Sequence, residues 1–216
     1  MLDTPPITRR SVLGLAVAGG ALLATGATAA SAPLNQINAA ASGVDPGLCD
    51  RAFAALSRHR RAIWANDVVA IADFGSSSAA PRLHLIDLVR GETTTLLVAH
   101  GLGSDPLDSG FLQAFSNQYG SNATSEGAFV TAERYTGMHG LSRRLNGLDP
   151  TNSNARARDV VIHAASYVSK DKIASAGKIG RSNGCFAVAE CDIAQVLARL
   201  GRGRLLYAGR SGTSTI

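Results

Sequence analysis

The stretch GRSNGCFAV, residues 180–188, contains the strongest chemical signal in this chain. Cys185 directly follows Ser182, Asn183 and Gly184, and no second cysteine lies near enough to suggest an obvious disulfide. A structural cysteine needs only an apolar environment or a partner. A nucleophilic cysteine needs a base, a site that binds an oxyanion and a backbone that admits substrate. Gly184 permits a close approach because it has no side chain, and the backbone amides around Cys185 could bind an oxyanion.

A candidate base lies upstream of this stretch. The residues VVIHAASY, 160–167, place His163 at the end of a β-branched apolar run that is typical of a buried strand. Eighteen residues separate His163 from Ser182, so the intervening loop can fold back and bring the imidazole to the thiol. Taken alone, each residue also has an ordinary structural interpretation, as a core histidine or a small buried cysteine.

Together, the pattern His163-x18-Ser182-x-Gly184-Cys185 resembles the active-site signature of the L,D-transpeptidases, the YkuD-like enzymes that remodel bacterial peptidoglycan. The likeness runs from about Arg82 to Val188. Residues 83–101 resemble the opening β-hairpin of the family, and residues 124–131 resemble one of its strands. Residues 135–167 are similar to a subgroup described as the murein L,D-transpeptidase catalytic domain. The resemblance implies a mainly β fold with peripheral helices, the β-sandwich of this family.

The resemblance also implies a role for each residue of the motif. Cys185 would attack the L,D peptide bond of a tetrapeptide stem and expel D-Ala. His163 would take the thiol proton and later activate an amine acceptor, to which the acyl group is transferred. The amides of Gly184 and Cys185 would hold the oxyanion, and Ser182 would shape the loop. The partners expected are peptidoglycan stem peptides, and no cofactor is expected.

The chain departs from the family pattern at several positions of this loop. Asn183 stands where the family has a histidine, and Phe186 stands where the subgroup usually has proline. Ala187 occupies a position that is often arginine or asparagine in the commoner motif. Arg181 is the nearest candidate to replace that charge, so Arg181 and Asn183 are predicted to contact substrate.

Three further residues, Tyr135, His139 and Gly140, are predicted to line the substrate cleft because the subgroup motif runs through them. His139 and His100, together with His163, could in principle form a three-histidine zinc site. However, no H-x-H or H-E-x-x-H spacing supports a zinc site. We therefore expect no metal.

Hydrophobic periodicity predicts the surrounding elements. Asp45-Pro46 is a good helix start, with an aspartate cap and proline at the first helical position. Apolar residues at helical spacing follow as far as Ile63, and a second helical face ends at Gly201. Strands are expected at residues 67–74, 82–88, 93–101, 127–135, 159–165 and 202–209. Long polar loops are expected at 101–127 and 169–184, and His59 and His84 are interpreted as surface positions.

The N-terminus has the layout of an export signal. Arg9 and Arg10 precede an apolar run and small residues, which resembles a twin-arginine signal peptide of residues 1–29. Residues 30–44 would be a flexible lead-in, and residues 45–216 the catalytic domain. The protein is therefore expected to be exported, to act in the periplasm or at the cell wall, and to have no stable membrane insertion once the signal is removed.

Charge and cysteine content limit other interpretations. The net charge of +5 comes without a dense basic run, so nucleic acid is not an expected partner. A bridge between Cys49 and Cys191 would leave Cys185 free. However, twin-arginine export carries proteins folded in a reducing compartment, so three free thiols are expected.

Three other protein classes share some of these features. A papain-like or NlpC-like peptidase places its cysteine before its histidine, the reverse of the order in this chain. A non-catalytic cell-wall binding module would not need both residues. An L,D-carboxypeptidase, which uses water as the acceptor, stays open.

Overall fold

The computed structural model describes Met1 and residues 43–212 of the chain. The predicted signal peptide beyond Met1, and the lead-in up to residue 42, lie outside the described residues. In the described part, the helices are α2 (Pro46–Arg58), η1 (Leu102–Ser104), α3 (Lys170–Ala176) and α4 (Ile193–Arg199). The strands are β1 (Val68–Asp73), β2 (Leu83–Asp87), β3 (Glu92–Leu96), β4 (Gly127–Gly137), β5 (Gly140–Gly147), β6 (Val161–Ala164), β7 (Phe186–Val188) and β8 (Leu205–Gly209).

The strands form one mixed sheet in the order β3-β2-β1-β8-β4-β5-β6-β7. Most neighbours are antiparallel, whereas β1 with β8 and β6 with β7 are parallel pairs. The chain that follows β3 makes an antiparallel bridge from Ala99 to Ala187 in β7. Because β3 and β7 are the two edges of the sheet, this bridge brings the edges together and gives the sheet a barrel-like form. The predicted fold class, mainly β with peripheral helices, is confirmed.

The alternation of side chains along the strands separates the apolar residues into clusters on opposite faces of the sheet. In β1, Ala70 and Ala72 belong to the main core, and Val69 and Ile71 belong to a second cluster that also includes residues of α2. Phe129 and Phe186 pack edge to face in the main core, with ring centroids 5.3 Å apart. β1 and β8 are buried on both faces, so they are central strands.

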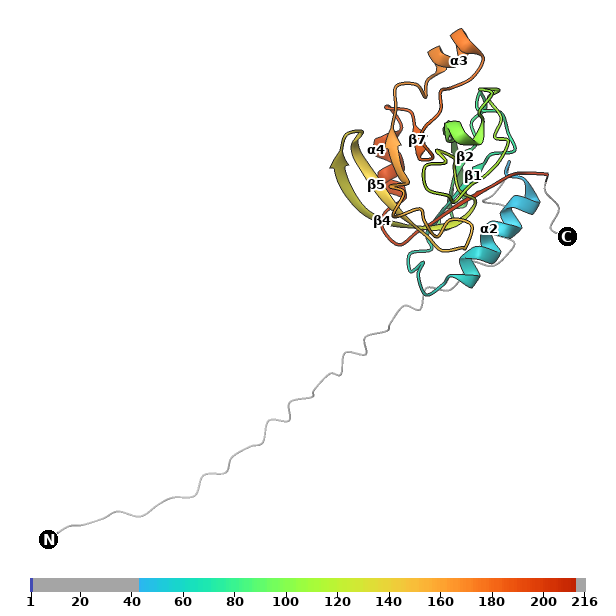
Figure 1. Cartoon of the computed structure of the whole chain (residues 1–216). Helices are drawn as coiled ribbons and strands as arrows, with labels where there is room; N and C mark the ends of the chain where they lie inside the picture. The colour runs from blue at the N-terminus through green and yellow to red at the C-terminus, as the bar shows by residue number, and fades with distance from the viewer. Residues whose placement is uncertain (2–42, 213–216) are drawn as a thin grey trace. The chain divides into compact units, whose positions relative to one another are not determined.

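Helix α2 begins as the sequence predicts. The Asp45 side chain accepts a hydrogen bond of 2.8 Å from the Leu48 amide, and proline occupies the first turn. Leu48, Ala52 and Ala55 are buried in the second cluster. The helix ends at Arg58, earlier than the apolar spacing suggested, and Ile63 joins the same cluster from the following loop. Figure 1 shows α2 beside the β-rich body and α3 at the far end from it.

Several predicted boundaries were wrong. The segment 140–147 is a strand, β5, although its sequence GLSRRLNG lacks β-branched residues, because it pairs with β4 in a hairpin. The predicted loop 169–184 contains α3, capped by the Ser169 side chain and ended by Gly177 at a φ of 71°. His84 is buried in β2 and contacts Thr95 of β3, so its interpretation as a surface position was wrong. The predicted loop 101–127 is irregular except for the short helix η1, which was not predicted, and Gly127, where β4 begins.

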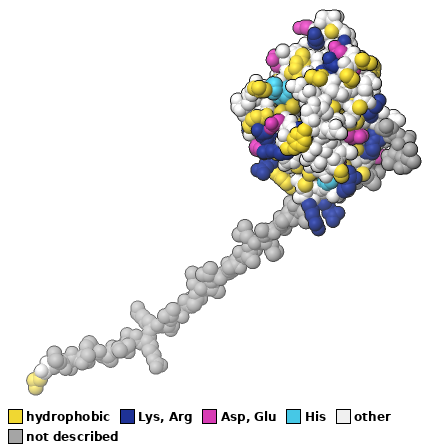
Figure 2. Space-filling model, in the orientation of Figure 1, with side chains coloured by type: hydrophobic (Ala, Val, Ile, Leu, Met, Phe, Trp, Pro, Cys, Tyr) yellow, Lys and Arg dark blue, Asp and Glu magenta, His cyan; other side chains and the backbone are white. Residues whose placement is uncertain are grey.

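Two further observations concern the surface and the thiols. No helix among the described residues is long and apolar enough to span a membrane. Figure 2 shows basic side chains in several small groups with acidic side chains between them. Cys49, Cys185 and Cys191 are all free, as predicted.

We predict that Asp45→Ala lowers the free energy of unfolding by about 1 kcal/mol, because the first turn of α2 loses its side-chain acceptor. Thermal or urea denaturation followed by circular dichroism measures the change. Asp50→Ala, an exposed change on the same helix, is the control and should stay within about 0.5 kcal/mol of wild type. Equal losses in the two variants would contradict the capping role of Asp45.

Candidate active site

The parallel pairing of β6 with β7 brings the predicted nucleophile and the predicted base together. Ile162 pairs with Phe186, and His163 pairs with Ala187. Cys185 immediately precedes β7, so this register places it beside Val161. Side chains alternate between faces along a strand, so Cys185 and His163 share one face as diagonal neighbours. On the opposite face, Ile162 and Phe186 pack in the main core.

His163 is buried, with only 3% of its surface exposed. Its Nδ1 lies 2.8 Å from the backbone carbonyl of Ala164. A carbonyl can only accept, so Nδ1 carries the hydrogen and Nε2 is the free acceptor of the neutral ring. Burial lowers the pKa of His163 below its usual value, the Ala164 carbonyl partly opposes this, and the charge of His139 lowers it further. The ring is therefore held as a neutral base with a defined tautomer.

His139 lies in direct contact with this ring. It occupies the turn between β4 and β5, and the two imidazoles stack with centroids 4.2 Å apart and planes 21° apart. Gly140 follows at a φ of +70° and opens β5. The Tyr135 ring lies lower on the hairpin, 4.3 Å from the guanidinium carbon of Arg144. Of these three predicted cleft residues, His139 is the one that contacts the predicted base.

The Cys185 thiol is half-buried, and its Sγ donates a hydrogen bond to the Asp159 carbonyl at 3.5 Å. Burial raises the pKa of the thiol. The Val161 amide and the positive charge of Arg158 oppose this rise, and the Asp159 carboxylate adds to it. In this conformation the thiol proton is directed at a backbone carbonyl, and both the thiol and His163 favour their neutral forms.

The Ser182 hydroxyl closes the turn that presents the cysteine. Its Oγ accepts from the Gly184 amide at 3.2 Å and donates to the Cys185 carbonyl at 2.6 Å. Gly184 has a φ of +107°, and a Cβ at this position would lie 2.7 Å from the Ala123 carbonyl oxygen. Only glycine fits this backbone without displacing its neighbours.

A buried network supports the turn from behind. The Ser182 amide donates to the His100 carbonyl, and the Leu102 amide donates to the Ser182 carbonyl. The His100 ring lies between Arg82 Nη2, 2.7 Å from Nδ1, and Asp105 Oδ2, 3.4 Å from Nε2. Burial lowers the pKa of His100 to about 4, and the Arg82 charge acts in the same direction. His100 is therefore a neutral link in a structural network.

Arg181 and Asn183 differ in their surroundings. Arg181 Nε lies 3.1 Å from Asp108, and its Nη1 donates to the Asp105 carbonyl, so its guanidinium is engaged with the loop that follows η1. Asn183 is exposed beside the cysteine turn. In the described part of the chain, no cluster of three or more His, Cys, Asp or Glu residues could hold a metal ion.

The sequence interpretation missed Arg158. Its Nη2 donates to the Ala123 carbonyl at 2.7 Å, and its Nη1 donates to Ser125 Oγ at 2.7 Å. A Cβ at Gly184 would lie 3.2 Å from the same Nη2, so the guanidinium borders the cysteine turn. The only available signal was a basic residue shortly before the strand of His163, which is too common to be informative.

Tyr167 was also missed. The backbone of Gly180 packs against its ring, where a Cβ would lie 2.7 Å from the tyrosine Cβ. Burial, together with the nearby Cys185, raises the pKa of Tyr167 to about 12. A tyrosine four residues after the predicted base is therefore a neighbour of the thiol.

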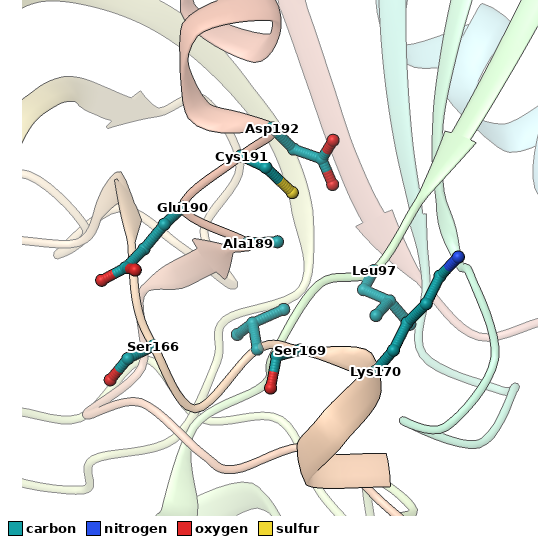
Figure 3. A pocket seen from close by; sticks show the side chains of 9 residues that line it. Leu97, Ser166, Ser169, Lys170, Ala189, Glu190, Cys191 and Asp192 are labelled. Carbon is teal, nitrogen blue, oxygen red and sulfur yellow. The ribbon is translucent and has the colours of Figure 1, made fainter. Parts of the chain in front are cut away.

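A hollow of about 480 Å³ lies beyond the C-terminal end of β7, whereas Cys185 lies before its N-terminal end. Figure 3 shows its walls coming from the segment after β3, the start of α3 and the turn before α4. Its lining residues are Leu97, Ser166, Val168, Ser169, Lys170, Ala189, Glu190, Cys191 and Asp192. None of the predicted site residues is among them, so this hollow is distinct from the site around Cys185.

The solved structures that match this chain are distant from it in sequence. An L,D-transpeptidase from Mycobacterium smegmatis is 13% identical over 66% of this chain and 58% of its own, with a TM-score of 0.41. An L,D-transpeptidase from Mycobacterium tuberculosis H37Rv is 12% identical over 67% of this chain and 58% of its own, with a TM-score of 0.39. The helical cell shape determining protein Pgp2 from Campylobacter jejuni is 9% identical over 68% of this chain and 49% of its own, with a TM-score of 0.42.

This chain thus spans less than two thirds of the length of each of these proteins. No curated protein matches it. The model of the L,D-transpeptidase catalytic domain family, in contrast, matches residues 40–208, which include the cysteine turn, both strands of the site and the hairpin that contacts His163. The chain therefore belongs to the L,D-transpeptidase catalytic domain family.

Proposed function

We propose that the protein is a peptidoglycan-remodelling L,D-transpeptidase that uses Cys185 as its nucleophile and His163 as its base. One observation carries the proposal. In a chain that belongs to this family, the β6–β7 register puts the thiol and a histidine with a free Nε2 on the same face. A binding module would need neither the buried neutral imidazole nor Gly184, which leaves the backbone next to the thiol without a side chain.

In the proposed reaction, His163 Nε2 takes the thiol proton as Cys185 Sγ bonds to the carbonyl carbon of the L,D peptide bond. The carbon–nitrogen bond then breaks, His163 returns the proton to the leaving D-Ala amine, and a thioester remains on Cys185. An acceptor amine attacks the thioester carbon and gives its proton to His163. The carbon–sulfur bond then breaks, the departing sulfur takes that proton from His163, and a new amide and a free Cys185 thiol remain. Because the thiol is directed at Asp159 in this conformation, the Cys185 side chain must first rotate toward His163.

The oxyanion of each tetrahedral intermediate is assigned to the amides of Gly184 and Cys185. In this conformation, the Gly184 amide donates to Ser182 Oγ at 3.2 Å, a long hydrogen bond. An anionic oxygen is a stronger acceptor than a hydroxyl, so it can compete for this amide. Ser182 keeps its short bond to the Cys185 carbonyl and so holds the turn while the amide is shared.

Activation of the thiol requires help because its burial favours the neutral form. Arg158 supplies a positive charge at the cysteine turn, where it lowers the pKa of the thiol. Arg181 was predicted to contact substrate, but its guanidinium is paired with Asp108. We therefore assign thiolate stabilisation to Arg158, and substrate contact to the exposed Asn183 and to Tyr135, His139 and Gly140 of the hairpin.

Transfer to an amine and hydrolysis by water share the same acyl-enzyme, so an L,D-carboxypeptidase is the second candidate. Closing a site against water favours the amine. The stacking of the hairpin turn on His163 covers the base from one side, and this observation favours transfer. The expected setting is the periplasm or the cell wall, with peptidoglycan stem peptides as partners and neither a cofactor nor nucleic acid involved.

We predict that a carbapenem acylates wild-type protein once, at Cys185, because a strained amide carbonyl reacts readily with an activated thiolate. Intact-protein mass spectrometry detects the adduct. Cys185→Ala should show none, and His163→Ala should slow acylation by about 10²–10⁴-fold. Cys191→Ala, which removes the exposed thiol outside the site, is the control and should react like wild type. An adduct that persists in Cys185→Ala would place the nucleophile elsewhere.

Incubation with a purified disaccharide-tetrapeptide should give free D-Ala and cross-linked dimers, measured by liquid chromatography and mass spectrometry. Tripeptide and D-Ala without dimers would make the enzyme a carboxypeptidase. A complete lack of D-Ala across several stem types would favour a binding module.

The role of Arg158 predicts a change in thiol titration. In a Cys191→Ala background, the rate of iodoacetamide alkylation of Cys185 against pH reports formation of the thiolate. Arg158→Gln should raise the pKa of the thiol, so the rise in rate should move to higher pH by about one unit. Arg181→Gln is the matched control, because its charge is paired with Asp108, and it should leave the profile in place. Equal shifts in both variants would assign the effect to general charge rather than to Arg158.

A further inference from the structure

The stacking of His139 on His163 joins two titratable rings from separate elements. His139 belongs to the two-residue turn between β4 and β5, whereas His163 belongs to β6. The rings are nearly parallel, at 21°, with centroids 4.2 Å apart. His163 is 3% exposed, and His139 is exposed to solvent. The proposed base, His163, is therefore the buried ring of the pair, and His139 is the ring in contact with solvent.

The position of His139 is fixed by the hairpin below it. The Tyr135 ring packs on Arg144, and Arg144 Nη1 bonds to Asp159 Oδ1 at 2.7 Å. Lower on the same hairpin, Glu133 accepts from Arg156 at 2.6 Å. These pairs tie the hairpin to the segment just before β6, whose Asp159 carbonyl faces the thiol. The hairpin that carries His139 is thus tied to this segment by several contacts, and the stack joins its turn to His163.

Two protonated imidazoles at this separation would repel each other strongly, since each would carry a full positive charge. The titratable and charged side chains around the site come from every neighbouring element. They are His139 from the hairpin, Arg158 and Asp159 from the segment before β6, Tyr167 from the segment after β6, and Cys185 from the segment before β7. Of these side chains, only His139 is recorded in ring contact with the base.

We propose that His139 is a positioning residue for the base: its stacked ring orients His163, and a positive charge on it opposes protonation of His163, which leaves Nε2 free. A proton on the exposed His139 stays in contact with water, whereas a proton on the buried His163 does not. A second proton on the buried His163 is then opposed by both burial and repulsion. The enzyme consequently keeps a working base at a pH where an isolated histidine would have lost it.

The same repulsion assists the proposed reaction. When His163 takes the thiol proton, the imidazolium that forms is destabilised by a positive His139 and so gives its proton readily to the leaving amine. His139 does not need to touch the substrate for this effect. The inference rests on the proposed role of His163 as base, so its test has one measurement that does not depend on activity.

The first measurement is a nuclear magnetic resonance titration of the His163 ring in the full-length protein. His139→Phe keeps a stacking ring but removes the charge, and it should raise the titration midpoint of His163 by about half to one pH unit. His139→Lys restores a positive charge without the ring and should move the midpoint back toward the wild-type value. Met138→Ala, the exposed neighbour in the same turn, is the matched control and should leave the midpoint unchanged.

The second measurement is the pH profile of carbapenem acylation at Cys185. A base with a higher titration midpoint becomes protonated, and therefore inactive, at a higher pH. The acidic limb of the His139→Phe rate profile should therefore shift to higher pH by the same amount as the His163 midpoint. The Met138→Ala profile should match wild type. An unchanged His163 midpoint in His139→Phe would overturn the inference, whatever the activity. A wild-type protein that is not acylated at all would overturn the proposed function, and the titration would still decide the role of His139.

Discussion

The parallel pairing of β6 with β7 is the constraint on which the site depends. This register pairs His163 with Ala187. Cys185 lies two residues before Ala187 and therefore on the same face. A slip by one residue would turn one of the two side chains into the main core, where Ile162 and Phe186 now lie. Ile162 and Phe186, each adjacent in sequence to one of these two residues, therefore do more than fill space. Their burial fixes the register, and the register fixes which side chains meet.

On its other side, the cysteine turn is supported by a charged network that is costly to bury. Arg82 is fully buried, and it donates to the Val98 carbonyl, the Ser76 carbonyl and the His100 ring. Burial lowers its pKa to about 9, a sign of how unfavourable this environment is for a cation. Such networks are weak evidence for stability, because desolvation offsets attraction. Their geometric effect is clearer: the network fixes residues 99–102, and these residues hold Ser182 by two backbone hydrogen bonds.

How well a feature could be predicted from the sequence depends on how close together in the chain its contacting residues lie. The α2 cap depends on Asp45 and Leu48, three residues apart, and was predicted correctly. Strand β5 was missed because Arg143, a residue type typical of the surface, is buried and donates to the Ala132 and Leu197 carbonyls. Helix α4 begins at Ile193, after a turn between Ala189 and Asp192, and ends at Arg199, just before the predicted stop at Gly201. Arg158 and the stacking of His139 depend on segments distant in sequence, and no spacing rule reveals them.

The electrostatics of the site argue for a resting state without an ion pair. Burial raises the pKa of Cys185 and lowers that of His163, so each shift favours the neutral form of its own group. A thiolate–imidazolium pair needs the pKa of His163 to exceed that of Cys185, and both shifts act against this order. Such a pair forms only when a partner for the new charges arrives, and in the proposed reaction that partner is the substrate carbonyl, which takes the electron pair of the sulfur as His163 takes the proton. A neutral thiol is also a poor target for oxidants, since the thiolate is the reactive form. The burial that disfavours the thiolate would thus protect the proposed nucleophile from oxidants until the substrate is bound.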